Sequence, residues 1–296
     1  MRTRGTILIA FVLLIIAAVF AWKIFNPGPT AFAEGSTVAL ADYRAANPTG
    51  VPADLANADI VKRGEYLARA PDCRACHTVS RDRPYAGGLP LLLPFGTLYS
   101  TNITPDKETG IGKYSDQDFL NAVQRGIRPD GTRLYPAMPF PSYTGMTDAD
   151  VLAIKAYLFN LPAVHAENQP TTFGFPYNQR WLMGIWSTFF NEDERFRPNP
   201  SQSAEWNRAP ISPRRWRIAA SVTPRAISRW HSTLTAGWYA FNISSDKGSG
   251  IGAWSDDELR DYLSAGHASA RGTAAGPMGE AVDQSLKDIA PSDIRA

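Results

Sequence analysis

The sequence of 296 residues has few cysteines and little excess charge. Two cysteines, Cys73 and Cys76, are too few for a disulfide framework or a four-thiolate metal site. A formal net charge of +2 leaves no surplus of basic side chains to neutralise phosphates, so we expect no nucleic-acid partner. With 44% of its residues apolar and 20% charged, the composition instead predicts ordinary buried cores in about two domains.

Long uncharged runs are also scarce, and the one that stands out is near the N-terminus. Residues 5–22 carry no charge, and arginines precede them while a lysine follows. A helix of this length is about 27 Å long, close to the thickness of the bilayer's hydrocarbon core. The small residues of Ala31–Ala33 offer a cleavage site. We therefore interpret residues 1–33 as a signal peptide or membrane anchor that leaves the rest outside the cytoplasm, with a buried core helix as the alternative.

The motif that carries chemistry is Cys73-x-x-Cys76-His77, which follows a short helical pattern. CxxCH is the attachment signature of c-type haem. Two thiols three positions apart can reach the two vinyl groups on one edge of a porphyrin, and the adjacent His77 then lies under the iron. A redox dithiol, a zinc site and a strained disulfide are the alternatives, and the first two lack a βαβ context and a fourth ligand, respectively. The motif predicts one covalently bound haem c.

A haem iron with one histidine needs a sixth ligand, and two methionines compete for that role. Met138 lies among prolines in LYPAMPFP, which fix an extended backbone that can present a thioether at one place. Met146 directly precedes the helix start at Thr147, where a hydrophobic staple explains it without iron. We predict Met138 as the distal ligand. Ligation by histidine and methionine raises the reduction potential and suits electron transfer.

Helix signals flank these ligands and predict an all-α haem domain over residues 34–164. Ser115 opens an amphipathic run that Gly126 could end. A second helix is expected over 147–161, with Val151, Ile154, Leu158 and Leu161 on one stripe.

An internal repeat follows at an offset of 140 residues. Residues 102–116 and 242–256 share nine of fifteen positions, and the same offset places Met138 over Met278. Ser255 and Glu258 form a capping box, so the second copy starts its helix as the first does. The repeat predicts tandem domains in which the second is degenerate, because it has no CxxCH.

The expected position of the second attachment motif holds other residues. Residues 208–229 contain six arginines and neither an acid nor a cysteine. A solvated loop and a phosphate or anionic-lipid contact are possible interpretations. Our hypothesis is a local frameshift over 209–222. Synonymous codons for this stretch can be chosen so that the same nucleotides, read one frame over, encode a sequence with CxxCH. A second haem is expected only if that stretch is a frameshift artefact.

Residues 165–207 are an aromatic-rich linker ahead of the degenerate second domain, 208–296. Its aromatic side chains favour core or interdomain packing, and docking onto a partner or a membrane is the alternative. The aromatic residues on which this interpretation rests are Phe173, Phe175, Tyr177, Trp181, Trp186, Phe189 and Phe190.

Four segments together resemble the multihaem cytochrome c subunits of membrane-bound periplasmic alcohol, aldehyde, gluconate and sorbitol dehydrogenases. They are GEYLARAPDCRACHT (64–78), TNITPDKETGIGKYSDQDF (101–119), DGTRLYPAMPFPSYTGMTDADVLAIKAYL (130–158) and FGFPYNQRWLMGIW (173–186). The resemblance implies three cytochrome c domains, a flavin or quinoprotein dehydrogenase as partner, and ubiquinone in the membrane as acceptor. It also implies thioether bonds at Cys73 and Cys76, with His77 and Met138 as axial ligands. The second motif is absent here, and on this resemblance we expect a truncated subunit that lacks the third domain.

The sequence thus predicts an electron-transfer subunit rather than an enzyme, on the periplasmic side of the inner (plasma) membrane. It would relay electrons from a dehydrogenase to the quinone pool through covalent haem. One alternative is a periplasmic thiol-disulfide oxidoreductase that uses Cys73 and Cys76. The other is a non-functional, truncated pseudo-subunit whose second half folds poorly.

Overall fold

The computed structural model describes residues 11–19, 21, 51–191, 201 and 242–295. Of the N-terminal apolar run it describes a helical stretch at 11–19, whose side chains are exposed. Among the described residues, no helix is both long enough and apolar enough to cross a bilayer. Most of the predicted signal peptide or anchor, 1–33, lies outside the described residues, and so does the arginine-rich stretch on which the frameshift hypothesis rests.

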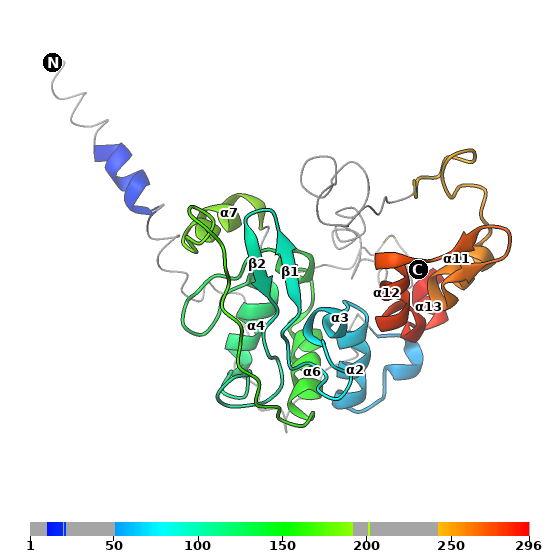
Figure 1. The fold of residues 1–296 in the computed structure, drawn as a ribbon, viewed down its shortest axis with the longest axis horizontal. Helices are drawn as coiled ribbons and strands as arrows, with labels where there is room; N and C mark the ends of the chain where they lie inside the picture. The colour runs from blue at the N-terminus through cyan, green and yellow to red at the C-terminus, as the bar shows by residue number, and fades with distance from the viewer. Residues whose placement is uncertain (1–10, 20, 22–50, 192–200, 202–241, 296) are drawn as a thin grey trace, which may run out of the picture.

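The described elements are mostly helices (Figure 1). The helices are α2 (Ile60–Arg69), α3 (Cys73–His77), α4 (Asp116–Arg125), α5 (Phe140–Tyr143), α6 (Asp148–Phe159), α7 (Leu182–Phe190), α11 (Asp256–Ala265), α12 (Gly276–Gln284) and α13 (Pro291–Arg295). Two 3-10 turns are η2 (Ala53–Leu55) and η4 (Leu286–Asp288). The strands are β1 (Pro90–Leu93), β2 (Gly96–Tyr99), β3 (His267–Ala268) and β4 (Gly272–Thr273).

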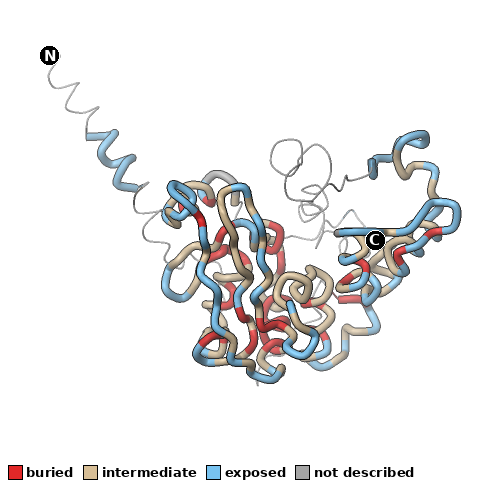
Figure 2. Tube along the Cα trace, viewed as in Figure 1, coloured by how far each residue is buried: buried red, intermediate tan, exposed pale blue. Residues whose placement is uncertain are grey.

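The core of the first region forms where α2 crosses α6. A Cβ on Gly64 would overlap the backbone carbonyl of Ala153, so the two helices can approach closely only because this position is glycine. The cluster around the crossing includes Leu67, Phe119, Leu120, Met146, Val151, Ile154 and Leu158. Burial in Figure 2 is accordingly concentrated in this region.

Helix α6 is buried on more sides than its sequence stripe predicts. Val151, Ile154 and Leu158 are buried as expected, but Asp150 and Lys155 are buried as well. The Lys155 Nζ lies 2.6 Å from an Asp116 carboxylate oxygen at the start of α4. This ion pair lets a charged side chain occupy a buried face, because its charge is compensated.

The expectation of an all-α fold is correct only in part. Most of the described elements are helices, but the described residues also contain two short β-hairpins. Strands β1 and β2 pair antiparallel from Pro90 with Tyr99 to Leu93 with Gly96. Strands β3 and β4 pair His267 with Thr273. The first hairpin turns at Pro94 and Phe95, and Gly96, the first residue of β2, has a φ of 135° that suits glycine.

The described part of the second copy repeats the local geometry of the first. Helices α4 and α11 both begin with a complete capping box, at Ser115 and Ser255. Both end at a glycine in the left-handed region, Gly126 and Gly266. The next turn then closes in the same way, since Leu134 N donates to Gly126 O at 2.8 Å and its counterpart Ala274 N donates to Gly266 O at 2.7 Å. The assignment of 208–296 as a degenerate second domain stays a prediction, because 202–241 lie outside the described residues.

The C-terminal segment packs against the exposed side of α2. The Tyr66 hydroxyl donates to Asp293 at 2.5 Å. Arg69 pairs with Asp288 at 2.7 Å, and the Ser285 hydroxyl donates to the Arg69 carbonyl oxygen at 2.8 Å. In Figure 1 the elements α12 and α13 accordingly lie next to α2 and α3. This contact is polar, in contrast to the apolar crossing of α2 with α6.

Candidate haem-attachment site

Helix α3 places both cysteines on a single turn. It begins after Asp72, which has a left-handed φ of 63°, so the chain turns sharply out of α2 before the motif. Cys73 and Cys76 are free and half-buried. Residues three apart on a helix project from the same face. The two thiols can therefore reach one edge of a planar group.

The ring of His77 is fixed by a backbone carbonyl. Its Nδ1 lies 2.7 Å from the Thr101 carbonyl oxygen, which can only accept, so Nδ1 carries the proton and donates. Burial lowers the pKa of His77, which keeps the ring neutral. Nε2 is then left with a lone pair, as a metal ligand requires. The sequence motif alone gave no sign of Thr101 as the partner.

The electrostatic environment of the two thiols does not favour a reactive thiolate. Burial, with the nearby Asp72 carboxylate, raises the pKa of Cys73 to about 12. Burial and the same carboxylate also raise the pKa of Cys76. A dithiol oxidoreductase needs a thiol with a lowered pKa. These surroundings therefore speak against the thiol-disulfide alternative.

The two candidate methionines lie in different surroundings. Met146 is 2% exposed and belongs to the core cluster together with Val151, so the predicted hydrophobic staple accounts for it. Met138 is half-buried, lies in the turn before α5, and packs at the edge of the same cluster as Cys73. A hydrogen bond from the Tyr143 hydroxyl to the Pro71 carbonyl oxygen, 2.9 Å, joins this segment to the one before α3. Met138 is the methionine that the core leaves available.

The counterpart of Met138 in the second copy has a different setting. Met278 lies within helix α12 rather than in an irregular turn. The sequence repeat at this position therefore does not extend to the same backbone conformation.

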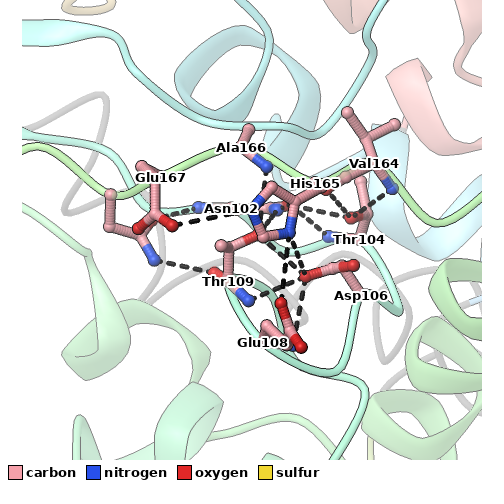
Figure 3. A network of polar contacts seen from close by, with 10 residues as sticks. Asn102, Thr104, Asp106, Glu108, Thr109, Val164, His165, Ala166 and Glu167 are labelled. Carbon is pink, nitrogen blue, oxygen red and sulfur yellow. Dashed lines mark hydrogen bonds and ion pairs between the residues drawn. The ribbon is translucent and has the colours of Figure 1, made fainter.

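A buried polar loop follows Thr101 and fixes its position (Figure 3). The Asn102 side chain donates to Thr109 Oγ1 at 3.0 Å and to the Val164 carbonyl oxygen at 2.7 Å. Its Oδ1 accepts from the backbone and hydroxyl of Thr104. Because Asn102 is only 2% exposed, these bonds form away from water and hold the loop rigidly. Sequence reasoning found the loop as a repeat but gave it no role.

The donor set fits a covalently attached haem. It has two thiols on one helical face, a neutral imidazole with a free Nε2, and a half-buried thioether next to the same core. Thioether attachment uses the thiols, and histidine with methionine is one of the ligand pairs that c-type haem iron takes. Among the described residues, no cluster of three or more His, Cys, Asp and Glu side chains offers an alternative metal site.

Comparison with known proteins agrees with this geometry. Residues 61–162 match the family model described as cytochrome c. This segment is a cytochrome c domain. Its bounds take in α2, α3, α4 and α6.

Curated relatives match over most of the chain. The gluconate 2-dehydrogenase cytochrome c subunit of Pantoea cypripedii is 40% identical over 261 residues, covering 82% of this chain and 59% of that protein. The fructose dehydrogenase cytochrome subunit of Gluconobacter japonicus is 39% identical over 262 residues, covering 85% and 54%. A diheme cytochrome c-type protein of Cereibacter sphaeroides is 28% identical over 261 residues, covering 79% and 82%. The chain thus spans somewhat more than half the length of the first two.

These matches confirm the family resemblance seen in the sequence. The first two relatives are named as cytochrome subunits of dehydrogenases, in agreement with the expectation of an electron-transfer subunit rather than an enzyme. A cytochrome c domain implies covalently bound haem c. The assignment of Cys73, Cys76, His77 and Met138 as haem-binding residues stays a prediction, as does the number of haems.

Proposed function

We propose that this protein is the electron-transferring subunit of a periplasmic dehydrogenase complex and that it carries one haem c. Cys73 and Cys76 would hold the haem through thioether bonds, and His77 and Met138 would ligate its iron. The observation that carries the proposal is the hydrogen bond from His77 Nδ1 to the Thr101 carbonyl oxygen, which leaves Nε2 unprotonated and able to bind a metal. When bound, the haem supplies one-electron redox chemistry.

The residues of the chain prepare the site for that chemistry. The carbonyl of Thr101 orients the imidazole and increases its basicity as a ligand, and the Asn102 loop keeps this carbonyl in place. The apolar cluster that Met138 and Cys73 border excludes water on that side. A low dielectric and a methionine ligand both favour the reduced state and raise the potential.

The partner and the acceptor are proposed from the relatives. Since relatives are named as subunits of gluconate and fructose dehydrogenases, a flavin or quinoprotein dehydrogenase is the proposed electron donor. Ubiquinone is the proposed acceptor, with the protein bound at the periplasmic face of the inner membrane. The apolar run at 5–22 supports export and membrane attachment.

Haem content tests the attachment. The protein, produced with a c-type maturation system, is expected to keep its haem under denaturing conditions at one haem per chain. Cys73→Ser and Cys76→Ser variants are expected to lose one thioether bond each, which the pyridine haemochrome spectrum reports as a shifted α-band. Resistance of both cysteines to alkylation distinguishes this from a free dithiol. A protein without covalent haem would contradict the proposal.

Matched methionine variants test the distal ligand. Met138→Leu is expected to abolish the near-infrared absorption that sulfur-ligated ferric haem gives and to lower the reduction potential. Met146→Leu is the control: it conserves volume in the core, so it is expected to cost less than about 1.5 kcal/mol of stability and to keep the band. If the band is lost in the Met146 variant instead, the assignment of Met138 is wrong.

A further inference from the structure

Two hydrogen bonds join the segment that carries Met138 to the aromatic-rich linker. Arg180 Nη1 donates to the Arg133 carbonyl oxygen at 3.0 Å. In the opposite direction, the Tyr135 hydroxyl donates to the Tyr177 carbonyl oxygen at 2.9 Å. Both acceptors are backbone carbonyls, so the two bonds fix the path of the chain on each side of the contact.

The ring of Tyr135 is the centre of this contact. Tyr135 is 8% exposed, and the Arg180 guanidinium lies over its ring, 4.7 Å from the centroid. The Phe173 ring packs against it edge to face, with the centroids 4.8 Å apart. A cation over an aromatic face is attracted more strongly where water is excluded. Tyr135 is therefore held by a cation, an aromatic ring and a hydrogen bond at once.

Tyr135 is coupled directly to Met138 through the backbone. Residues 135–140 are called the methionine turn below. Met138 N donates to the Tyr135 carbonyl oxygen at 3.0 Å, and Phe140 N donates to the Met138 carbonyl oxygen at 2.7 Å. Phe140 is 1% exposed, and its ring centroid lies 6.0 Å from that of Trp186 in α7. Linker residues thus contact both ends of the methionine turn.

The linker is in turn attached to strand β2. Thr172 N donates to the Thr97 carbonyl oxygen at 3.0 Å, and Thr97 N donates to Thr172 Oγ1 at 2.9 Å. A Cβ on Gly96 would lie 2.7 Å from the Thr172 carbonyl oxygen, so the close approach requires glycine there. Strand β2 leads to Thr101, whose carbonyl orients His77. One segment of the chain therefore contacts the supports of both candidate iron ligands.

The methionine turn has little of its own to hold it. Pro136 and Ala137 are exposed, and Met138 is only half-buried. Prolines have no N–H, so they donate no hydrogen bond within the turn. A segment with few buried contacts opens at a low cost in free energy. The fraction of time that the thioether is in place should then depend on the linker.

We propose that Arg180 and Tyr135 are positioning residues for the distal ligand. In this proposal, residues 172–186, called the clamp below, hold the methionine turn so that the Met138 sulfur stays next to the iron. The clamp lies beyond residues 61–162, which match the cytochrome c model, so the functional haem domain extends to α7. This inference rests on the proposed role of Met138 as a ligand.

Competition by free imidazole with the full-length ferric haem protein tests the clamp. Imidazole can bind the iron only while the sulfur is released, so its apparent Kd falls as the released fraction rises. Arg180→Ala removes a charge-assisted hydrogen bond and the cation over Tyr135, and it is expected to lower the apparent Kd about tenfold. Tyr135→Phe removes only the hydroxyl and keeps the ring, so a decrease of about threefold is expected. Arg180→Lys keeps the cation and is expected to recover part of the loss.

A matched variant outside the clamp is the control. The Tyr66 hydroxyl also donates a hydrogen bond, to Asp293 in the C-terminal segment, so Tyr66→Phe makes the same chemical change elsewhere. Its apparent Kd for imidazole is expected to equal that of the unmodified protein. Hydrogen exchange gives a second measurement: in Arg180→Ala the Met138 amide is expected to exchange faster while the amides of α6 keep their rates. A general loss of stability would accelerate both.

The possible outcomes separate the clamp from the ligand assignment. Unchanged imidazole affinity in both Arg180→Ala and Tyr135→Phe would overturn the clamp and leave Met138 as the ligand. An equal gain of affinity in Tyr66→Phe would also overturn it. If the unmodified haem protein lacks the near-infrared band of sulfur ligation, Met138 is not a ligand, and the clamp fails together with that assignment.

Discussion

The described loop and helix of the second repeat copy have the local geometry of their counterparts in the first, but they are covered differently. In both, an asparagine and an aspartate organise a loop, a capping box starts a helix, and a glycine ends it. In the first copy α5 and α6 pack against α4, and residues 164–168, called the strap below, bond to the loop. In the second copy the loop is exposed and α11 has no buried residue. The comparison teaches that the duplicated sequence encodes local geometry, while burial comes from the elements around it.

Among matched substitutions in the two copies, the largest difference in lost stability is expected at the glycine that ends α4 and α11. A Cβ on Gly126 would lie 2.5 Å from the Phe140 ring, which is 1% exposed and cannot move. With the strain of a left-handed alanine added, Gly126→Ala is expected to cost about 3 kcal/mol. On Gly266 the nearest atom would be 3.5 Å away, so Gly266→Ala is expected to cost only about 1 kcal/mol.

Urea denaturation measures the stability lost in Gly126→Ala. Hydrogen exchange of α11 measures the stability lost in Gly266→Ala. If both variants lost the same stability, the packing of Phe140 against Gly126 would contribute nothing and the contrast between the copies would fail at this position.

The next largest difference in lost stability is expected at the loop asparagines, Asn102 and Asn242. Asn102→Ala removes buried hydrogen bonds: Thr104 N loses its partner, and the Val164 carbonyl keeps only the longer bond from Thr104 Oγ1 at 3.3 Å. A loss of about 2–3 kcal/mol is expected. Asn242 bonds to Ser244 N and Ser249 Oγ, which are already exposed and can bond to water in Asn242→Ala, so a loss below about 1 kcal/mol is expected. The free energy of unfolding and local hydrogen exchange give the two values. A larger loss in the second copy would show that its loop is covered in solution.

Sequence reasoning predicted best what is determined within a few residues. The helix starts at Ser115, Thr147 and Ser255 all follow the expected N-cap geometry, since each side chain accepts from a backbone N–H three residues on. Met146 is buried in the core, as its expected staple position implies, while the assignment of Met138 as ligand stays a prediction.

Features set by distant contacts could not be predicted. The partner of His77 is a backbone carbonyl 24 residues away, and a carbonyl carries no sequence signature. The strap is recognised mostly through its backbone, so its residues give little sign of their contacts with Asn102. The aromatic residues of 165–207 also divide in a way composition does not show: Phe173 is buried against Phe95 and Tyr135, while Phe175 is 82% exposed.

The helix caps are expected to behave equally in both copies. Ser115→Ala and Ser255→Ala each remove one capping box whose groups are exposed, so each is expected to cost about 1 kcal/mol, independent of what packs nearby. Hydrogen exchange of the first turns of α4 and α11 measures both. Ser→Thr at each position keeps the acceptor and is the control. A clear inequality between the copies would mean that tertiary packing, not the cap, holds one of the helix starts.

The smallest difference is expected in the response of the two loops to acid. Hydrogen bonds from the backbone and hydroxyl of Thr109 hold the pKa of Asp106 below its usual range, and those of Ser249 do the same for Asp246. Because the pKa of the folded state is depressed, each aspartate stabilises its loop above the unfolded value near 4, and this stabilisation is lost as the pH falls through the folded value.

Acidification is therefore expected to open the second loop first, because the strap still holds the first when Asp106 is protonated. Exchange of the Thr109 and Ser249 amides between pH 5 and pH 3, corrected for the intrinsic rates, measures the order of opening. Asp246→Asn removes the titrating group and is expected to leave the second loop equally open at both pH values. Simultaneous opening of the two loops would mean that the carboxylates, and not the strap, determine their stability in acid.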